Sequence, residues 1–371
     1  MTMLVLACLA QVALLTVAAW TLPVLARPTL PFGVRVPAAR VADPAVTAQR
    51  RRYSRAVVIL GMLTALVSAP AVAMRGSLDS LTVTAVLLGA AFVALYAAAH
   101  RVIRAAKRRG DWYAGTRQAV TADTTWHTHP VRPPWPLLTP SLVLLAGTAA
   151  IGLQRYHSLP DTLPALRGLG VDSAHRVATT PTTAFAPVLA QLGITLLVPV
   201  LLAAIIRARP ETDAERPAGS ARRYRVYLRG IATLLLAGAA CANLTLLLLA
   251  LQQWHVTPPS PLTTAATWAP MAAAATAFLI FGVRVGEAGH RLQPLPGEAG
   301  SGYVQRDDDR YWHLAGTVYV NRHDPAILVH QRAGSRWTLN LGNPVAWIAL
   351  AVVAALALLS LLGVIDLPST G

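Results

Sequence analysis

Eight runs of about 20 mostly apolar residues constrain this chain more than any other feature of its sequence. A helix rises about 1.5 Å per residue, so about 20 residues cross the roughly 30 Å hydrocarbon core of a bilayer. The central part of each run is free of charged residues. The sequence therefore predicts an all-α transmembrane protein with about eight membrane-spanning helices. The runs cover residues 3–26, 56–74, 81–100, 135–153, 184–206, 230–251, 264–284 and 344–364.

The composition favours helices in lipid over a large soluble core. Of the 371 residues, 54% are hydrophobic and 13% are charged, whereas a soluble domain has about 25% charged residues. The two cysteines, Cys8 and Cys241, both lie inside apolar runs. They therefore indicate neither a disulfide framework nor a zinc site.

The basic residues alternate between connections. Connections that follow odd-numbered runs hold 28 Lys and Arg residues, and those that follow even-numbered runs hold 4. Lys and Arg concentrate on the cytoplasmic side of membrane proteins, so both termini are predicted to be extracytoplasmic. The first run has no basic residue before it, which favours a retained anchor over a signal peptide. The net charge of +16 also suits a nucleic-acid binder, but this alternation favours the membrane, and we expect no direct nucleic-acid binding.

The runs and the loops between them predict three parts of the chain. Residues 1–284 form a seven-span membrane domain with an extracytoplasmic segment at 154–183. Residues 285–343 form a cytoplasmic linker and a small β module, and residues 344–371 form the last span and a tail. In the module, β-branched and aromatic content predicts three short strands at 310–320, 326–331 and 336–341.

The β module carries the acidic and aromatic residues that differ most from the rest of the chain. We interpret Asp307, Asp308 and Asp309 as solvated acids that face arginines of neighbouring cytoplasmic loops. The aromatic residues Tyr311, Trp312 and Trp337 give a small sheet apolar area to bury. An open sheet cannot cross lipid because its edge amides would stay unpaired. We therefore expect a compact module that rests against the membrane-proximal ends of the last two spans.

The sequence gives little sign of catalysis or of a cofactor. Nucleophile-elbow, metalloprotease, P-loop and dinucleotide-binding patterns do not occur. Histidines in loops, such as His127 and His129, fit solvated positions better than a metal site. We therefore expect a protein that is not an enzyme and has no cofactor. Mildly polar residues within the spans predict hydrogen bonds between helices; these are Gln11, Gln191, Thr195, Asn243 and Thr245.

The most specific motif, YxxLPDxxP, follows the fourth run. Its prolines enforce an extended, rigid entry into the loop. The segment resembles the core motif of a bacterial membrane protein family of unknown function related to the SdpI immunity proteins. The sequences "PFGVRVP" at 31–37 and "DDDRYW…WTLN" at 307–340 resemble other parts of that family. Relatives often continue with His and an aromatic residue, where Ala165 and Leu166 stand here. The matching motif residues are Tyr156, Leu159, Pro160, Asp161 and Pro164.

The resemblance implies a sensor or immunity role in the bacterial plasma membrane. The 154–183 segment would meet an extracellular peptide or envelope ligand, and the cytoplasmic loops would hold a regulator. The alternative is a small-molecule or lipid transporter with an uncharged pathway, and a membrane-bound hydrolase is a third, less favoured class. In each case the lipid bilayer is the first partner of the chain.

Overall fold

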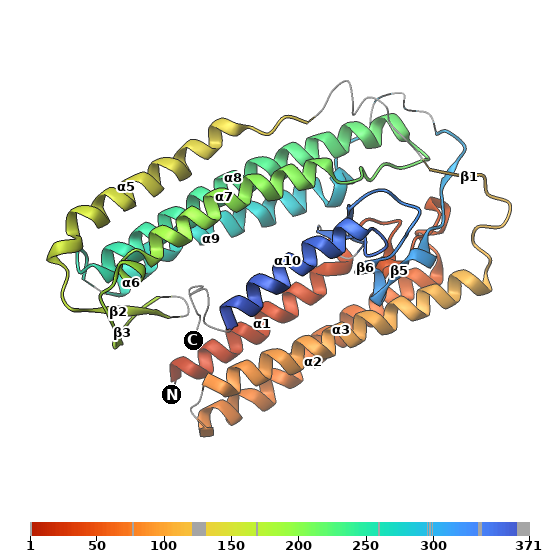
Figure 1. Cartoon of the computed structure of the whole chain (residues 1–371). Coiled ribbons are helices and arrows are strands. Elements are labelled where there is room, and N and C mark those ends of the chain that lie inside the picture. Colours follow the sequence, from red (N-terminus) through yellow and green to blue (C-terminus); the bar gives the residue numbers. More distant parts are fainter. Residues whose placement is uncertain are drawn as a thin grey trace. The chain divides into compact units, whose positions relative to one another are not determined.

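The computed structural model describes residues 2–75, 78–120, 131–167, 170–258, 260–294, 296, 298, 300–332 and 336–361. Seven of the described helical segments are long and apolar enough to cross a membrane, in agreement with the predicted membrane-helical fold. They contain the long helices labelled in Figure 1. These helices are α1 (Thr2–Leu25), α2 (Pro44–Arg75), α3 (Leu78–Arg109), α5 (Thr139–Arg155), α7 (Ala186–Arg207), α8 (Pro217–Gln253) and α9 (Pro261–Val285).

The eighth predicted span begins with helix α10 (Pro344–Leu361), which has 18 residues. The last three residues of that predicted run, 362–364, lie outside the described part of the chain. The number of spans beyond seven therefore stays a prediction.

Contacts between residues divide the chain into two compact units. Unit 1 consists of Met1–Asp123, Arg209–Tyr224 and Val285–Ala346. Unit 2 consists of Thr124–Ala208, Arg225–Arg284 and Trp347–Gly371. Unit 1 thus joins the first three long helices to the segment that contains the expected β module, a grouping that differs from the three predicted parts.

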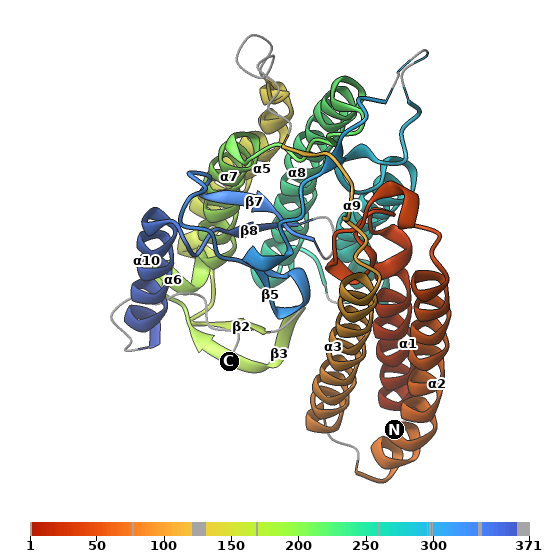
Figure 2. The ribbon, with the colours of Figure 1, turned by 90° about the vertical axis from the view of Figure 1, so that its right-hand side faces the viewer.

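In unit 1, helices α1, α2 and α3 lie side by side (Figures 1 and 2). Their apolar side chains form a common core that includes Val12, Val57 and Phe92. After α1 the chain makes a turn, η1 (Pro31–Gly33), that buries Phe32 completely. The ring of Phe32 contacts the rings of Tyr53 and Tyr96 edge to face, at centroid distances of 5.1 and 5.6 Å. The loop after α1 is therefore fixed to the helices α2 and α3.

Unit 1 also contains short strands, and they correct the predicted strand pattern. The structure has β5 (Trp312–His313) paired with β6 (Val318–Tyr319), and β7 (Leu328–His330) paired with β8 (Trp337–Leu339), both antiparallel. The pair β7–β8 is visible in Figure 2. The single strand predicted at 310–320 is wrong, because Leu314 and Ala315 adopt positive φ angles of 45° and 56°. These residues and Gly316 reverse the chain and divide that segment into two strands. Elsewhere in unit 1, β1 (Gln118–Ala119) pairs with β4 (Val304–Gln305) in parallel.

Unit 2 contains α5, the short helix α6 (Pro181–Ala184), α7 and most of the residues of α8 and α9. Buried polar side chains join these helices. Gln191 Nε2 donates to Thr148 Oγ1 at 3.0 Å and to the backbone oxygen of Asn243 at 2.7 Å. Asn243 Nδ2 donates to Thr195 Oγ1 at 2.9 Å. The predicted hydrogen bonds between helices are therefore confirmed for these residues.

A β hairpin in unit 2 was not predicted from the sequence. It consists of β2 (Thr162–Arg167) and β3 (Gly170–Ala178), which pair antiparallel with a register shift between Pro164 and Ala165. The hairpin begins two residues after Pro160, within the segment that carries the YxxLPDxxP motif. It precedes α6, whose first turn is capped by the side chain of Thr180.

Candidate functional site

The acidic triplet Asp307–Asp309 lies in unit 1, and its predicted solvation is wrong for two of the three residues. The side chains of Asp308 and Asp309 are only 18% and 13% exposed, whereas that of Asp307 is 33% exposed. The triplet follows β4, and Asp309 begins the short turn η6 (Asp309–Tyr311). This turn directs the carboxylates toward basic side chains from distant parts of the chain. The arginine partners that we expected are present, but they are buried with the acids.

Arg35 and Lys107 provide two of these basic partners. Arg35 Nε donates to Asp308 Oδ1 at 2.8 Å, and the backbone N–H of Arg35 donates to Asp309 Oδ1 at 3.0 Å. Lys107, near the end of α3, donates from Nζ to Asp307 Oδ1 at 2.7 Å and to Asp309 Oδ2 at 2.6 Å. The triplet is thereby tied to the loop after α1 and to the end of α3.

Arg332 provides the third basic partner and is almost completely buried, with a side chain that is 1% exposed. Its guanidinium donates to both Asp308 and Asp309, and also to the backbone oxygen of Gly33 at 3.2 Å. The same guanidinium lies over the ring of Trp312, 5.0 Å from the centroid. Arg332 follows β7, so it connects the β5–β6 hairpin, the β7–β8 hairpin and the loop after α1.

Glu211 adds a further acid to this cluster of charges. Its carboxylate accepts from Arg27 and Arg35, each at 2.9 Å, and its side chain is 8% exposed. Four basic and four acidic side chains then face one another, so their formal charges balance. We call this set the ion network; it consists of Arg27, Arg35, Lys107, Arg332, Glu211, Asp307, Asp308 and Asp309.

The ion network keeps Asp308 and Glu211 ionised although burial opposes their charge. Burial alone would raise the pKa of Asp308, but attraction to Arg35 and Arg332 outweighs it and holds that pKa well below the ordinary value. Burial also opposes ionisation of Glu211, and Arg27 and Arg35 likewise hold its pKa well below the ordinary value. A buried pair of this kind is costly to break because the remaining charge stays without compensation. The network should therefore form or open as a unit.

Two tight turns meet beside the network. Gly33 has φ +76° and Gly316 has φ +87°, a left-handed region that side chains rarely adopt. A Cβ atom on Gly33 would lie 2.6 Å from the backbone oxygen of Ala315. The turn after α1 and the turn between β5 and β6 thus pack backbone against backbone, and this close approach brings Arg35 and Arg332 to the same acids.

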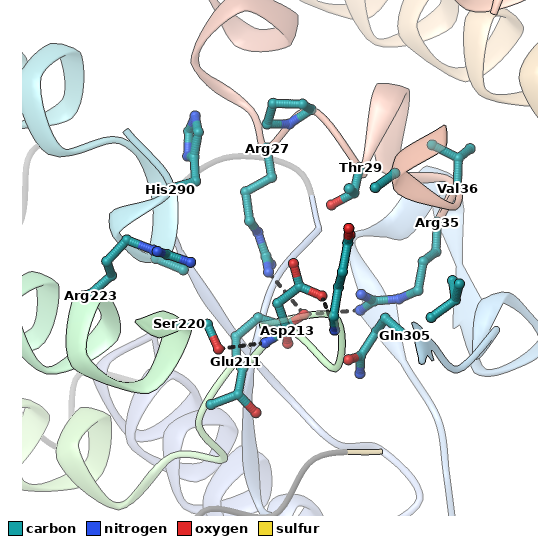
Figure 3. A pocket seen from close by; sticks show the side chains of 16 residues that line it. Arg27, Thr29, Arg35, Val36, Glu211, Asp213, Ser220, Arg223, His290 and Gln305 are labelled. Carbon is teal, nitrogen blue, oxygen red and sulfur yellow. Dashed lines mark hydrogen bonds and ion pairs between the residues drawn. The ribbon is translucent and has the colours of Figure 1, made fainter. Parts of the chain in front are cut away.

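A pocket of about 190 Å³ borders the network in unit 1. Figure 3 shows the guanidinium groups of Arg27 and Arg35 converging on the carboxylate of Glu211. Asp213 and Arg223 also line it, so its charges are mixed in sign. The Nε and Nη2 atoms of Arg27 are buried and have no hydrogen-bond partner among the described residues.

The β hairpins are held in shape by a second set of polar contacts. Asn340 is fully buried, and its Nδ2 donates to the backbone oxygens of Asn321, Asp324 and Ala326 at 2.9–3.1 Å. Asp324 pairs with Arg209 and accepts from the hydroxyl of Tyr319 at 3.0 Å. Among the aromatic residues singled out earlier, Trp312 is buried, and Tyr311 and Trp337 are half-buried. The predicted aromatic area is thus buried in part.

Within unit 1, the β hairpins contact parts of the chain that the sequence did not predict. The turn η7 (Leu314–Gly316) packs on α3 and on η1, contacts that the prediction did not include. In addition, His330 Nδ1 lies 3.4 Å from Oε1 of Glu287, just after α9, and both side chains are buried.

The YxxLPDxxP residues lie in unit 2 and are partly exposed. Tyr156 is half-buried against the ring of Phe185, at a centroid distance of 5.8 Å. Pro160 and Asp161 are exposed, Leu159 is half-buried and Pro164 is buried. Hydrogen bonds to its backbone oxygens anchor the motif: Thr179 N donates to the oxygen of Asp161 at 2.9 Å, and the side-chain Thr179 Oγ1 donates to that of Pro160 at 2.5 Å. The motif therefore exposes Pro160 and Asp161 on a hydrogen-bonded backbone, while Pro164 is buried.

The sequence predicted arginine partners for the acidic triplet but not which ones. Arg35 and Arg332 lie within the ranges 31–37 and 307–340 that resemble the family, but nothing there joins either residue to the acids, and Lys107 and Glu211 carry no such signal. Among the described residues no group of His, Cys, Asp or Glu could hold a metal ion, and the predicted solvated pair His127 and His129 lies outside those residues.

No family model matches this sequence, and no curated protein or solved structure matches it either.

Proposed function

We propose that the protein is a multi-pass bacterial plasma-membrane protein that acts as a non-enzymatic sensor or immunity-type protein. In this proposal the YxxLPDxxP segment meets an extracellular peptide or an envelope ligand. The segment with the β hairpins, residues 303–343, faces the cytoplasm and holds a regulator. Both termini are extracytoplasmic.

The ion network is the observation that carries this proposal. It joins four separate parts of the chain through charges that are stable only together, so small changes can shift it between closed and open states. A signalling protein needs a two-state element, and in this proposal the ion network is that element. The exposed edge at Pro160 and Asp161 supports a ligand-facing role for the motif.

The proposed sensing role is tested with a double variant. We expect Pro160→Ala with Pro164→Ala to abolish protection or signalling in a growth screen against secreted peptides and envelope stress, while the protein still accumulates in the membrane. Both prolines lie outside the apolar runs, so insertion should not need them; because Pro164 is buried and Pro160 is exposed, Pro164→Ala alone is the folding control. If the variant fails to accumulate, the motif is a folding element and its ligand-facing role is refuted.

The proposed orientation has a separate test. A cytoplasmic reporter fused at about residue 218 should be active, and one fused at about residue 258 inactive, because the surrounding stretches 207–229 and 252–263 hold seven and no Lys or Arg residues. The reverse pattern would place the β hairpins outside the cell and would contradict the proposal.

A transporter with an uncharged pathway is the second candidate, favoured by the polar layer of unit 2. Gln191 Oε1 and Asn243 Oδ1 are buried and have no hydrogen-bond partner among the described residues. Such oxygens could accept from a polar solute. An Asn243→Leu variant that folds but loses export or uptake of a solute, with peptide protection intact, would favour this function over sensing.

A further inference from the structure

A second cavity in unit 1, of about 440 Å³, lies at the C-terminal end of α1. One part of its lining is apolar and comes from the last turn of α1 and the residue after it, with Pro23, Val24 and Ala26. The other part is polar and includes Arg50 from α2 and Arg291 from the segment after α9. This volume far exceeds the roughly 10–15 Å³ that one water molecule needs, so the cavity has room for a small polar group.

The charge of this cavity has one sign, unlike that of the pocket beside the ion network. Arg50, His290 and Arg291 are the titratable residues that line it, and the lining among the described residues contains no acid. Burial lowers the pKa of the His290 imidazole, so at neutral pH the positive charge comes from the two arginines. A cavity with this balance favours an anion.

The guanidinium group of Arg291 is held in place at the cavity, and that of Arg50 is held more loosely. Arg291 Nη2 donates to the backbone oxygen of Val24 at 2.8 Å, which fixes it at the end of α1. Arg50 Nη2 donates to the backbone oxygen of Pro28 at 3.5 Å, a long contact. Arg50 Nε is buried and has no hydrogen-bond partner among the described residues. Arg50 therefore retains a donor for a ligand.

The position of the cavity along the helices points to the membrane interface. The apolar part of α1 ends at Leu25, and the first arginine of the chain is Arg27. Val24 is 49% exposed, so the apolar side of the cavity is open to the surroundings of α1. A molecule in this cavity would contact charged groups at one end and apolar surface at the other.

We propose that this cavity binds one anionic phospholipid, with its phosphate on Arg50 and Arg291 and the start of its acyl chains along Pro23 and Val24. Guanidinium groups bind phosphate through paired hydrogen bonds, and basic pockets beside membrane helices suit anionic headgroups. A free phosphate shares the headgroup chemistry but makes no use of the apolar side. This site is separate from the proposed sensing role and does not depend on it.

The test uses the full chain in nanodiscs of phosphatidylcholine with or without phosphatidylglycerol. Native mass spectrometry counts retained phosphatidylglycerol, and a titration of short-chain phosphatidylglycerol into detergent-solubilised protein gives its affinity. We expect Arg50→Gln to weaken that affinity by about ten- to hundredfold, the value of a charge-assisted hydrogen bond. Arg51→Gln is the matched control because it removes the same charge from the next, exposed residue of α2.

The controls separate this site from weaker explanations. Equal losses in the Arg50 and Arg51 variants would indicate diffuse surface attraction and would overturn the proposal. Glycerol 3-phosphate that binds as tightly as the short-chain lipid would assign the cavity to a soluble anion and would also overturn it. The thermal midpoint in pure phosphatidylcholine checks folding. If Arg50→Gln does not fold, Val24→Trp at the half-exposed apolar edge should still reduce lipid retention, and full retention in that variant would refute the site.

Discussion

Replacing Asp308 by Asn should release the β hairpins of unit 1 from their docked state. The Asp308 carboxylate accepts from Arg332, from Arg35 Nε at 2.8 Å and from Trp312 Nε1 at 3.3 Å. Arg35 and Arg332 are 6% and 1% exposed, so water cannot replace the lost charge. Removing one partner of a buried pair costs about 3–5 kcal/mol. Because Glu211 and Asp309 still face these arginines, we expect the lower end, about 3 kcal/mol.

Hydrogen–deuterium exchange of residues 312–339 in the full-length protein measures this effect. A loss of about 3 kcal/mol should lower amide protection by about a hundredfold, since 1.36 kcal/mol corresponds to a factor of ten. Asp307→Asn is the control in the same triplet, because Asp307 is 33% exposed and pairs with Lys107. Water reaches the Asp307 carboxylate, and Lys107 keeps Asp309 as a second partner, so we expect a smaller loss of protection than for Asp308. Equal effects in the two variants would refute the burial argument.

Further outcomes follow from the same unit. Gly33→Ala should lower the stability of unit 1 in thermal unfolding by more than the roughly 1–3 kcal/mol of backbone strain, because the new Cβ would lie 2.6 Å from a backbone oxygen. Gly115→Ala is the control for strain alone, since Gly115 has φ +67° and open space around it. Equal losses of stability in the two variants would contradict the turn packing. Acid should open the ion network: the pKa of Asp308 is lowered from the ordinary 3.8, so its stabilisation is complete above about pH 4 and declines as pH falls through the lowered value. Unchanged protection of residues 312–339 down to pH 2, relative to the intrinsic exchange rate at each pH, would contradict this. Asn340→Ala should lower the stability of the β hairpins by about 3 kcal/mol, because several buried backbone oxygens lose their donor. We expect faster amide exchange in β7 and β8 alone. Unaltered exchange in these strands would refute the prediction.

The membrane helices could be predicted because their signal is local. An apolar run of about 20 residues satisfies its own backbone hydrogen bonds and needs no distant partner to be recognised. The break within the predicted strand at 310–320 was missed, although Gly316 marked the turn, because the β-branched residues on both sides favoured continuous strand.

The ion network could not be predicted in the same way. Its acids were visible as a triplet, but their partners come from 32 Lys and Arg residues spread over the whole sequence. Arg35 and Asp308 are 273 residues apart, and no local pattern joins them. Whether an Asp is solvated or buried depends on such distant contacts, so the prediction of solvated acids was wrong. The prediction of strands rested on local composition and was correct in part.

The length of chain between the partners of the ion network has a consequence for how the protein is made. Lys107 and Asp307 are separated by 200 residues. At about 5–20 residues per second, a ribosome needs roughly 10–40 s to synthesise that stretch. During this interval Arg35 and Lys107 have emerged without their acids, so the insertion machinery meets them as unbalanced positive charges. The same residues can thus first help to retain their loops on one side of the membrane and later, once the acids arrive, become neutral parts of a folded unit.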